Sequence, residues 1–270
     1  MNGGTSQSEA SVKDREAQYA ASAGLQPEQA RVGVRRTYFA ADQVSAMASK
    51  ASTDLANGRL PWVSIKEPGS WARLASGADD DWLHSIDKAL AAVPGPVWFT
   101  FHHEPNDDGS PADFRAAYAR LLSIVTAPNV ANVPIIFAPN PLTGENYDWA
   151  DWFGAPGELA FDFLGYDAYP GRSKTVQPEW SLWVPQLVTI SETYGVAFGI
   201  CETGAKQTTY DAPGGAGWLT RAYDALIGSG QCVAVAYFDT DVNSVADWTL
   251  RGERMVDFAE QLVRPETAHL

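Results

Sequence analysis

Two glutamates, Glu104 and Glu202, each follow a run of apolar residues that predicts a buried strand. The two runs are Val97-Trp98-Phe99-Thr100-Phe101 and Val196-Ala197-Phe198-Gly199-Ile200-Cys201. Aromatic and β-branched residues in such runs indicate strands covered on both faces, as in a parallel sheet. A carboxylate beside such a strand is costly unless it is paired or functional. Either residue alone has an alternative interpretation as a hydrogen-bonded residue of the sheet edge, but the pair together indicates chemistry.

Two carboxyl groups at the ends of parallel strands suit the cleavage of a glycosidic bond. One protonates the departing oxygen, while the other attacks the anomeric carbon or activates a water molecule. Separations of about 5–5.5 Å between the carboxyl groups are typical of the retaining route, which passes through a covalent intermediate. If Glu104 ends the fourth strand of a barrel and Glu202 the seventh, the two side chains face each other across its C-terminal mouth.

Two histidines, His102 and His103, directly precede Glu104. Because side chains alternate across a strand, we expect His102 to share a face with Glu104 and His103 to lie on the other face. A metal site built from a histidine and a glutamate is the alternative function of this stretch. No HExxH motif or second histidine cluster follows, so we expect no metal and no cofactor.

The elements that must position these groups alternate along the chain. Predicted strands cover residues 32–39, 60–66, 96–104, 133–138, 161–169, 196–202 and 233–238. Predicted helices cover residues 11–23, 41–56, 79–92, 112–126, 179–194, 217–227 and 251–263. This alternation is typical of an α/β protein with a parallel sheet or barrel. Since the length of 270 residues suits one large unit, and no repeat or linker divides it, we predict a single domain over residues 1–270.

The strand count leaves one strand unaccounted for. A closed (β/α)8 TIM barrel has eight strands, whereas the pattern predicts seven. We therefore expect a (β/α)8 barrel whose first strand is missing or reduced to residues 1–4. On this interpretation, Met1 is an internal methionine of a longer natural protein.

Composition narrows the possible partners. The formal charge of −14 argues against nucleic acid or an anionic membrane surface, and no apolar run is long enough to span a bilayer. Ten tryptophans in an acidic protein favour stacking against sugars, although many of these rings serve a core. Cys201 and Cys232 are expected at opposite ends of neighbouring strands, as free thiols. The first residues lack the features of a signal peptide.

Three short motifs carry a resemblance to a known family. They are Phe101-His102-His103-Glu104-Pro105-Asn106, Gly165-Tyr166-Asp167-Ala168-Tyr169 and Ile200-Cys201-Glu202-Thr203-Gly204. In this order they resemble glycoside hydrolase family 26, over a span from about Arg35 to Phe238. That family contains β-mannanases and some β-1,3-1,4-glucanases and xylanases. It belongs to a clan of (β/α)8 barrels whose catalytic glutamates lie on strands four and seven.

The resemblance implies roles for individual residues. Glu104 would be the acid/base and Glu202 the nucleophile, with His103 beside the reacting sugar and Tyr169 donating a hydrogen bond to the nucleophile. The chain departs from the family in two places that contact the sugar. Lys66 stands where many members have a histidine, and no aromatic residue follows Glu104 closely. Other aromatic residues are therefore candidates for a sugar platform, with core packing as the alternative for each: Trp149, Trp152, Phe153, Phe238 and Trp248.

Together these features predict a retaining endo-β-1,4-mannanase that acts as a monomer on a β-linked polysaccharide or oligosaccharide. The resemblance implies an extracellular location, although no signal peptide is visible in this chain. A β-1,3-1,4-glucanase or xylanase of the same clan is one alternative. A non-catalytic carbohydrate-binding barrel is another, and it differs in having no need for both glutamates.

Overall fold

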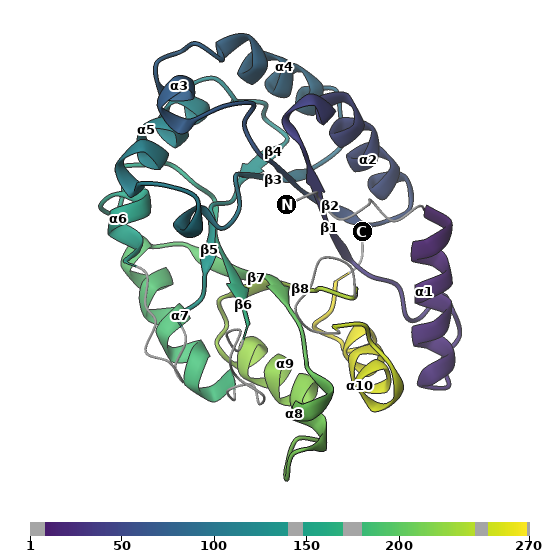
Figure 1. Ribbon diagram of the computed structural model, residues 1–270. Coiled ribbons are helices and arrows are strands. Elements are labelled where there is room, and N and C mark those ends of the chain that lie inside the picture. Colours follow the sequence, from purple (N-terminus) through teal and green to yellow (C-terminus); the bar gives the residue numbers. More distant parts are fainter. Residues whose placement is uncertain (1–8, 140–147, 170–179, 241–247, 269–270) are drawn as a thin grey trace.

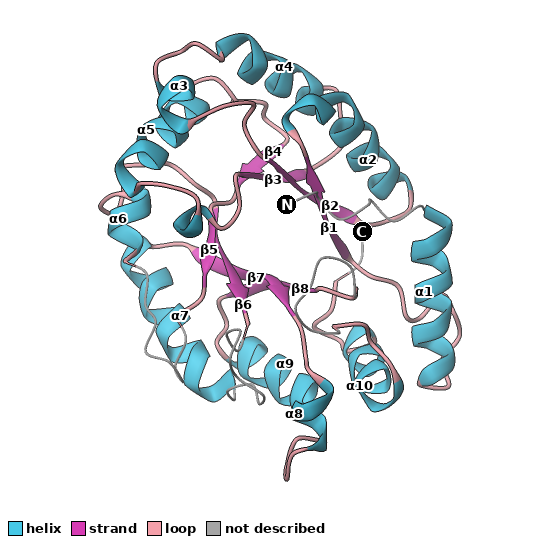
Figure 2. Cartoon of the chain, viewed as in Figure 1, coloured by secondary structure: helices cyan, strands magenta, loops and turns pink. Residues whose placement is uncertain are grey.

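A computed structural model describes residues 9–139, 148–169, 180–240 and 248–268 of the chain. Its strands form a central ring that is surrounded by helices (Figures 1 and 2). The strands are β1 (Val34–Phe39), β2 (Leu60–Ile65), β3 (Val97–Phe101), β4 (Val130–Asn132), β5 (Ile135–Phe137), β6 (Phe163–Ala168), β7 (Ala197–Thr203) and β8 (Cys232–Tyr237). The α-helices are α1 (Glu9–Ser22), α2 (Val44–Ala56), α3 (Trp71–Ala75), α4 (Asp80–Ala91), α5 (Pro111–Leu122), α6 (Trp149–Phe153), α7 (Trp180–Tyr194), α8 (Gln207–Asp211), α9 (Trp218–Gly228) and α10 (Gly252–Leu262), and two 3-10 turns are η1 (Ala41–Gln43) and η2 (Pro105–Asp107).

The strands pair in parallel in the order β1-β2-β3-β4 and, in a second sheet, β5-β6-β7-β8. This arrangement confirms the predicted α/β barrel class. β1 and β8 adjoin at the side where the two sheets meet, and the structure shows no ladder between them among the described residues. The first strand that we expected to be missing or reduced concerns residues 1–4, which lie outside the described residues.

The predicted strand 133–138 corresponds to β5, and a separate short strand that was not predicted, β4, precedes it. β4 pairs with β3 and β5 pairs with β6, with Val133 and Pro134 between them. Val133 still donates its backbone N–H to Phe99 O (2.8 Å), whereas Pro134 accepts from Gly165 N (2.8 Å). Because proline has no N–H to donate, the ladder toward β3 stops there and the chain changes partners. β4 and β5 therefore occupy one strand position of the barrel, one after the other.

The other boundaries differ from the prediction mainly at element ends and in short helices. The strand predicted to reach Glu104 ends at Phe101. The helices α3 and α8 were not predicted, because five residues are too few to show an apolar period. Ser70 begins α3 by accepting a hydrogen bond from Arg73 N. α6 is also five residues long and lies between the predicted strands at 133–138 and 161–169.

Three aromatic rings fill the interior of the barrel. Trp62 lies 5.2 Å from Trp98 and 5.5 Å from Phe163 between ring centroids, in edge-to-face arrangements. Gly199 makes this packing possible, because a Cβ there would lie 3.1 Å from the Trp62 ring and 3.2 Å from that of Phe163. The rings therefore make a solid floor beneath the C-terminal ends of the strands.

The helix α1 is fastened to the barrel by buried charges. The Arg59 side chain, 1% exposed, donates to Glu9 and lies within 3.6 Å of Glu16 Oε1. In the middle of α1, Arg15 donates to Asp239 beyond β8 (2.8 Å from Nε). Cys201 and Cys232 are free thiols, as predicted. In the described part of the chain, no helix is long and apolar enough to cross a membrane.

Candidate active site

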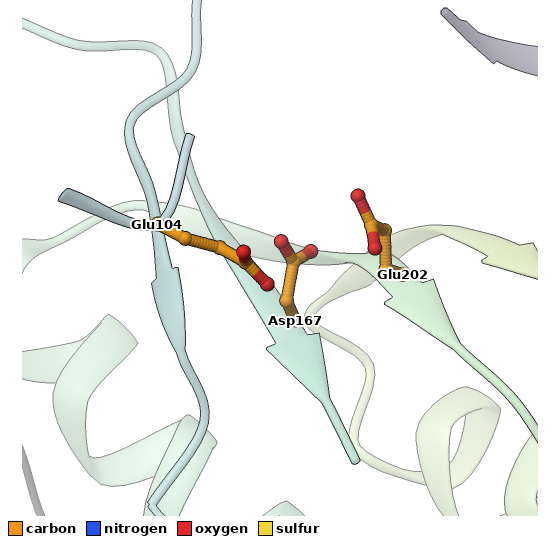
Figure 3. Close-up of side chains that lie close together, drawn as sticks. All are labelled: Glu104, Asp167 and Glu202. Atoms are coloured by element: carbon orange, nitrogen blue, oxygen red, sulfur yellow. The ribbon is translucent and has the colours of Figure 1, made fainter. Parts of the chain in front are cut away.

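Three carboxyl groups converge at the C-terminal ends of the strands (Figure 3). Glu104 follows β3, Asp167 lies in β6 and Glu202 lies in β7. One carboxylate oxygen from each residue lies within 4.8 Å of the others. In Figure 3, Glu104 points toward Asp167, which lies between the two glutamates. The two glutamates singled out from the sequence are therefore brought together, with an aspartate between them.

The backbone after β3 leaves the regular strand conformation. His102 has φ 42° and Glu104 has φ 56°, which are left-handed values for residues other than glycine. Upstream, Thr100 points into the barrel, where its hydroxyl oxygen accepts a hydrogen bond from Trp62 Nε1 (3.0 Å), and Phe101 points outward and stacks on Phe114. Regular alternation would next turn His102 inward. The left-handed turn instead keeps it outward, 4.9 Å from the Trp71 ring.

The placement of the two histidines expected from strand alternation was therefore wrong, whereas the position of His103 agrees with the one that the family resemblance implies. His103, rather than His102, faces the barrel interior, where its ring lies 5.0 Å from Tyr38 and its Nδ1 lies 3.3 Å from Ser64 Oγ. Alternation holds only for extended backbone, and the positive φ at His102 breaks it. Burial lowers the pKa of His103 well below its usual value, and the charges of Arg36 and Lys66 lower it further. At neutral pH, His103 is thus an uncharged imidazole beside the carboxylates.

Glu202 accepts hydrogen bonds at both oxygens. Tyr38 in β1 donates to Oε1, and Tyr169 after β6 donates to Oε2 (3.2 Å). The bond from Tyr169 is the one that the family resemblance implies. Burial raises the pKa of Glu202, while Arg36 and the two tyrosine hydroxyls act in the opposite direction. Hydrogen bonds to a carboxylate favour its ionised form, so these groups hold an anion at a site that would otherwise favour the neutral acid.

Arg36 supplies the buried positive charge of the site. Its guanidinium lies 4.7 Å from the centre of the Tyr38 ring and 5.4 Å from that of Trp62. Its three nitrogens are buried and have no hydrogen-bond partner in the described part of the chain. Although burial lowers the pKa of Arg36, the charges of Tyr38, Asp167 and Glu202 raise it above its usual value. Arg36 therefore stays cationic between the aromatic floor and the carboxylates.

Asp167 is the most buried of the three acids, at 1% exposed. No donor group in the described residues hydrogen-bonds to either of its oxygens. Burial raises the pKa of Asp167 well above its usual range, and the charges of Glu202 and Glu104 raise it further, whereas Arg36 lowers it in part. Glu104 points toward Asp167, and adjacent carboxyl groups disfavour each other's ionisation, so Asp167 ionises with difficulty in the folded protein.

The three acids also form the group of described residues whose oxygens converge enough to hold a metal ion. Carboxylate oxygens suit hard cations such as Mg²⁺ or Ca²⁺. Arg36 offsets part of the negative charge of this group, and tyrosine hydroxyls donate to both oxygens of Glu202.

Lys66 and His102 meet at a carboxylate outside this cluster. Lys66 Nζ lies 2.6 Å from Asp108 Oδ2, and His102 Nε2 lies 2.9 Å from the same oxygen. On its other side, His102 Nδ1 lies 2.7 Å from Glu67 Oε2. The ammonium group expected to bind substrate is therefore paired with Asp108. Together with Lys66, His102 lowers the pKa of Asp108, although its partial burial acts in the opposite direction.

The candidate platform aromatics divide into two groups. Trp149 and Trp152 are 3% and 6% exposed, and their rings pack against Phe153 and Phe114 in the core beneath the helices. The structure therefore assigns these two rings and Phe153 to core packing, which corrects their candidacy as a sugar platform. Phe238 is half-buried at the end of β8, where its N–H donates to Thr203 O (2.8 Å).

Trp248 lies beside the cluster of three carboxyl groups. Its ring is 5.1 Å from that of Tyr169, and a Cβ at Gly204 would lie 2.6 Å from it. The ring is 6% exposed, so it acts chiefly as a wall that supports Tyr169. Of the predicted aromatic residues, Trp248 is thus the one that packs on Tyr169, which is hydrogen-bonded to Glu202.

The sequence interpretation did not assign roles to Asp167, Arg36, Tyr38 or His102. A usable signal was present for two of them. Arg36 and Tyr38 stand at alternate positions of a predicted strand, so they share one face, and polar groups repeated on the inner face of a barrel indicate a site. Asp167 stood within a quoted motif but had no separate reason attached to it. His102 depended on a backbone turn that no local pattern encodes.

Comparison with known proteins supports the fold. No protein-family model and no curated protein matches the sequence. Among solved structures, the chain is similar to a GH5_18 enzyme from Bifidobacterium longum in complex with Manb1-4GlcNAc, with a TM-score of 0.68 and 10% identity over 97% of this chain and 75% of the other. It is also similar to fungal β-1,4-galactanases, with a TM-score of 0.63 and 12% identity over 90% of each chain.

An engineered protein is similar as well, with a TM-score of 0.59 and 13% identity, but this chain spans only 62% of its length. The natural neighbours are TIM-barrel glycoside hydrolases and confirm the predicted fold class. They do not single out family 26. At these identities the likeness concerns the fold, and chemistry must be argued from the site itself.

Proposed function

We propose that this protein is a retaining β-glycoside hydrolase in which Glu202 is the nucleophile and Glu104 is the acid/base. The observation that carries the proposal is the convergence of the two carboxyl groups, with one oxygen of each within 4.8 Å. Retaining enzymes hold their carboxyl groups about 5–5.5 Å apart, whereas inverting enzymes leave about 6.5–9.5 Å for a water molecule. The separation in this barrel favours direct attack by a carboxylate.

In the first step, an oxygen of Glu202 forms a bond to the anomeric carbon while the bond from that carbon to the leaving oxygen breaks. Glu104 transfers its proton to the leaving oxygen. Arg36 and the hydroxyls of Tyr38 and Tyr169 keep Glu202 ionised before the attack.

In the second step, water attacks the anomeric carbon and the bond to Glu202 breaks. Glu104, now ionised, accepts a proton from the water, so the sugar leaves with its original configuration. The neighbouring Asp167 has a raised pKa and takes part in the proton balance of Glu104. Neighbouring carboxyl groups disfavour each other's ionisation, which helps Glu104 to keep its proton near neutral pH.

The substrate we propose is a β-1,4-linked mannan, cleaved internally and outside the cell. Support comes from the motifs that resemble family 26 and from the structural neighbour bound to Manb1-4GlcNAc. Mixed-linkage β-glucan and xylan are the alternatives to be tested beside it. All are neutral polymers, which is consistent with a protein of charge −14 whose partner need not be cationic or anionic.

The test is hydrolysis of mannan, mixed-linkage glucan and xylan by the purified chain and by the variants E104Q and E202Q. We expect both variants to lose at least a thousand-fold in kcat, with product anomers followed by NMR showing retention in the unmodified protein. E253Q, in an exposed position of α10, is the matched control.

Three outcomes would contradict the proposal. Hydrolysis retained in either variant would remove that glutamate from the mechanism. An inverted product would exclude the covalent route. Binding of a glycan by the unmodified protein without any hydrolysis would indicate a carbohydrate-binding barrel.

A further inference from the structure

The segment that carries the proposed acid/base is held in an unfavourable backbone conformation. His102 and Glu104 are the residues other than glycine that have positive φ in the described part of the chain. Such residues cost on the order of 1–3 kcal/mol each and persist only where their surroundings hold them. Two of them within three residues therefore require an unusually firm support.

That support is centred on the His102 ring, which is buried at 4% exposed. Glu67 Oε2 lies 2.7 Å from Nδ1, and Asp108 Oδ2 lies 2.9 Å from Nε2. Trp71 Nε1 also donates to Nδ1 (3.2 Å), so three side chains contact the two nitrogens of the ring. We call His102, Glu67 and Asp108 the His102 clamp.

The clamp joins two loops that leave neighbouring strands. Glu67 follows β2 and Asp108 follows β3, so the ring ties both loops to one point. Trp71 covers the ring edge-on at 4.9 Å. Gly109 lies against the other side of Trp71, where a Cβ would be 2.5 Å from the indole. A residue with a side chain at position 109 would thus push the Asp108 loop away from the clamp.

A pocket of about 280 Å³ opens beside the clamp, lined by Glu67, Ser70, Trp71, His102, Asp108 and Asp113. It gives the ring and its carboxylates contact with solvent on the helix side of β3. The catalytic carboxyl groups lie on the other side, in the barrel interior. The clamp therefore supports the acid/base from behind and is placed away from the reacting sugar.

We propose that the His102 clamp is a positioning device for Glu104. By holding His102 outward, it fixes the left-handed turn that brings His103 and Glu104 to the interior, where Glu104 reaches Asp167. Without the clamp, the segment relaxes toward a regular strand and Glu104 moves relative to the leaving oxygen. This inference rests on the proposed acid/base role of Glu104. Misplacement of a catalytic group by about 1 Å costs on the order of a hundred-fold in rate.

The test compares two substrates that differ in their need for an acid. Mannopentaose has a poor leaving group, whereas a 2,4-dinitrophenyl β-mannobioside releases a stable anion without protonation. H102F keeps the ring volume and removes both clamp contacts. We expect its kcat on mannopentaose to fall on the order of ten- to a hundred-fold, with KM within about two-fold of the original. We expect the burst of dinitrophenol release, which reports the first step, to change less than about three-fold.

Two further variants keep the test decisive if H102F does not fold. D108A removes the exposed half of the clamp and should show the same split on a smaller scale. H102N tolerates positive φ and keeps a donor near Glu67, so it should recover part of the lost rate. H84N, at an exposed histidine of α4, is the control and should match the unmodified protein.

An equal loss on both substrates, a rise in KM alone, or unchanged rates in H102F and D108A would overturn the positioning role. Failure of the proposed function has a different signature. In that case E104Q retains hydrolysis of mannopentaose, whatever the clamp variants do. If E104Q is inactive on mannopentaose but still gives the dinitrophenol burst, the acid/base role stands and the clamp variants decide the inference alone.

Discussion

The hydroxyl of Tyr38 donates to Oε1 of Glu202, which links β1 to β7 across the side of the barrel where its two sheets meet. Tyr169 donates to the second oxygen. The carboxylate is therefore fixed by groups on or just after two other strands, and its orientation does not depend on its own strand alone. In the proposed role of Glu202 as nucleophile, these hydrogen bonds fix the direction of one carboxylate oxygen and keep the carboxylate ionised.

Removing one of these donors should slow the reaction. A hydrogen bond to a charged group contributes about 1.5–3 kcal/mol, so Y38F is expected to lower kcat/KM on the order of ten- to a hundred-fold. Y169F should do likewise, and the double variant should lose more than either single one. Steady-state kinetics measure all three. Y194F removes a hydroxyl that donates to Gly154 O away from the site, and a Y38F variant as active as Y194F would contradict the role of Tyr38.

The charge on Asp167 should shape the pH dependence of the reaction. An acid beside a potential anion keeps its proton to higher pH, and a neutral neighbour removes that effect. Because the pKa of Asp167 is raised by burial and by coupling to Glu202 and Glu104, D167N should move the basic limb of kcat/KM to lower pH, by roughly one to three units. A pH–rate profile measures this shift. A basic limb that stays in place would show that Asp167 does not influence the acid.

The same substitution should stabilise the fold at neutral pH. The folded-state pKa of Asp167 lies above its unfolded value, so its favourable contribution is complete below about pH 4 and is lost as pH rises through the raised pKa. At pH 7 the unfolded chain ionises Asp167 readily whereas the folded protein does not, so this group lowers the stability of the unmodified protein relative to D167N.

Thermal unfolding of both proteins between pH 4 and pH 8 measures this difference. We expect D167N to have the higher Tm at pH 7 and the two values to converge at pH 4. A difference in Tm that is constant over this range would indicate a packing effect in place of an electrostatic one. Greater stability with lower activity is the usual signature of a site whose charges serve catalysis.

The sequence predicted the strands and the two glutamates of this site better than the residues that hold them in place. Glu104 and Glu202 were identified because apolar runs lead directly to them, and runs of this kind determine strands through burial, a property that is local in the sequence. The break between β4 and β5 at Pro134 could also have been predicted, since a proline lacks the N–H that a central strand needs. It was missed because the apolar run continues past it.

The orientation of His102 was out of reach for a different reason. Its left-handed backbone is held by Glu67 and Asp108, on loops that follow two different strands. Nothing in the residues next to His102 favours that conformation. Pairings such as Tyr38 with Glu202 likewise join residues 164 positions apart, so they follow from the closed geometry of the barrel and cannot be inferred from a single segment.

The contact between Gly204 and Trp248 offers a test of how the wall supports the nucleophile. A Cβ at position 204 would lie 2.6 Å from the indole, so in G204A the ring must move. Since Trp248 packs on Tyr169, which binds Glu202, we expect lower kcat together with a loss of stability of about 1–3 kcal/mol from overpacking. Chemical denaturation and kinetics on the same samples measure both effects.

G228A is the matched control for this variant. Gly228 is the last residue of α9, and a Cβ there would meet no atom of the described residues within 4 Å. Alanine in a helix is favoured over glycine by about 1 kcal/mol, so G228A should leave kcat unchanged and keep or slightly raise stability. If G204A behaves like G228A, the Trp248 ring moves without a cost in stability and contributes nothing to the orientation of Tyr169.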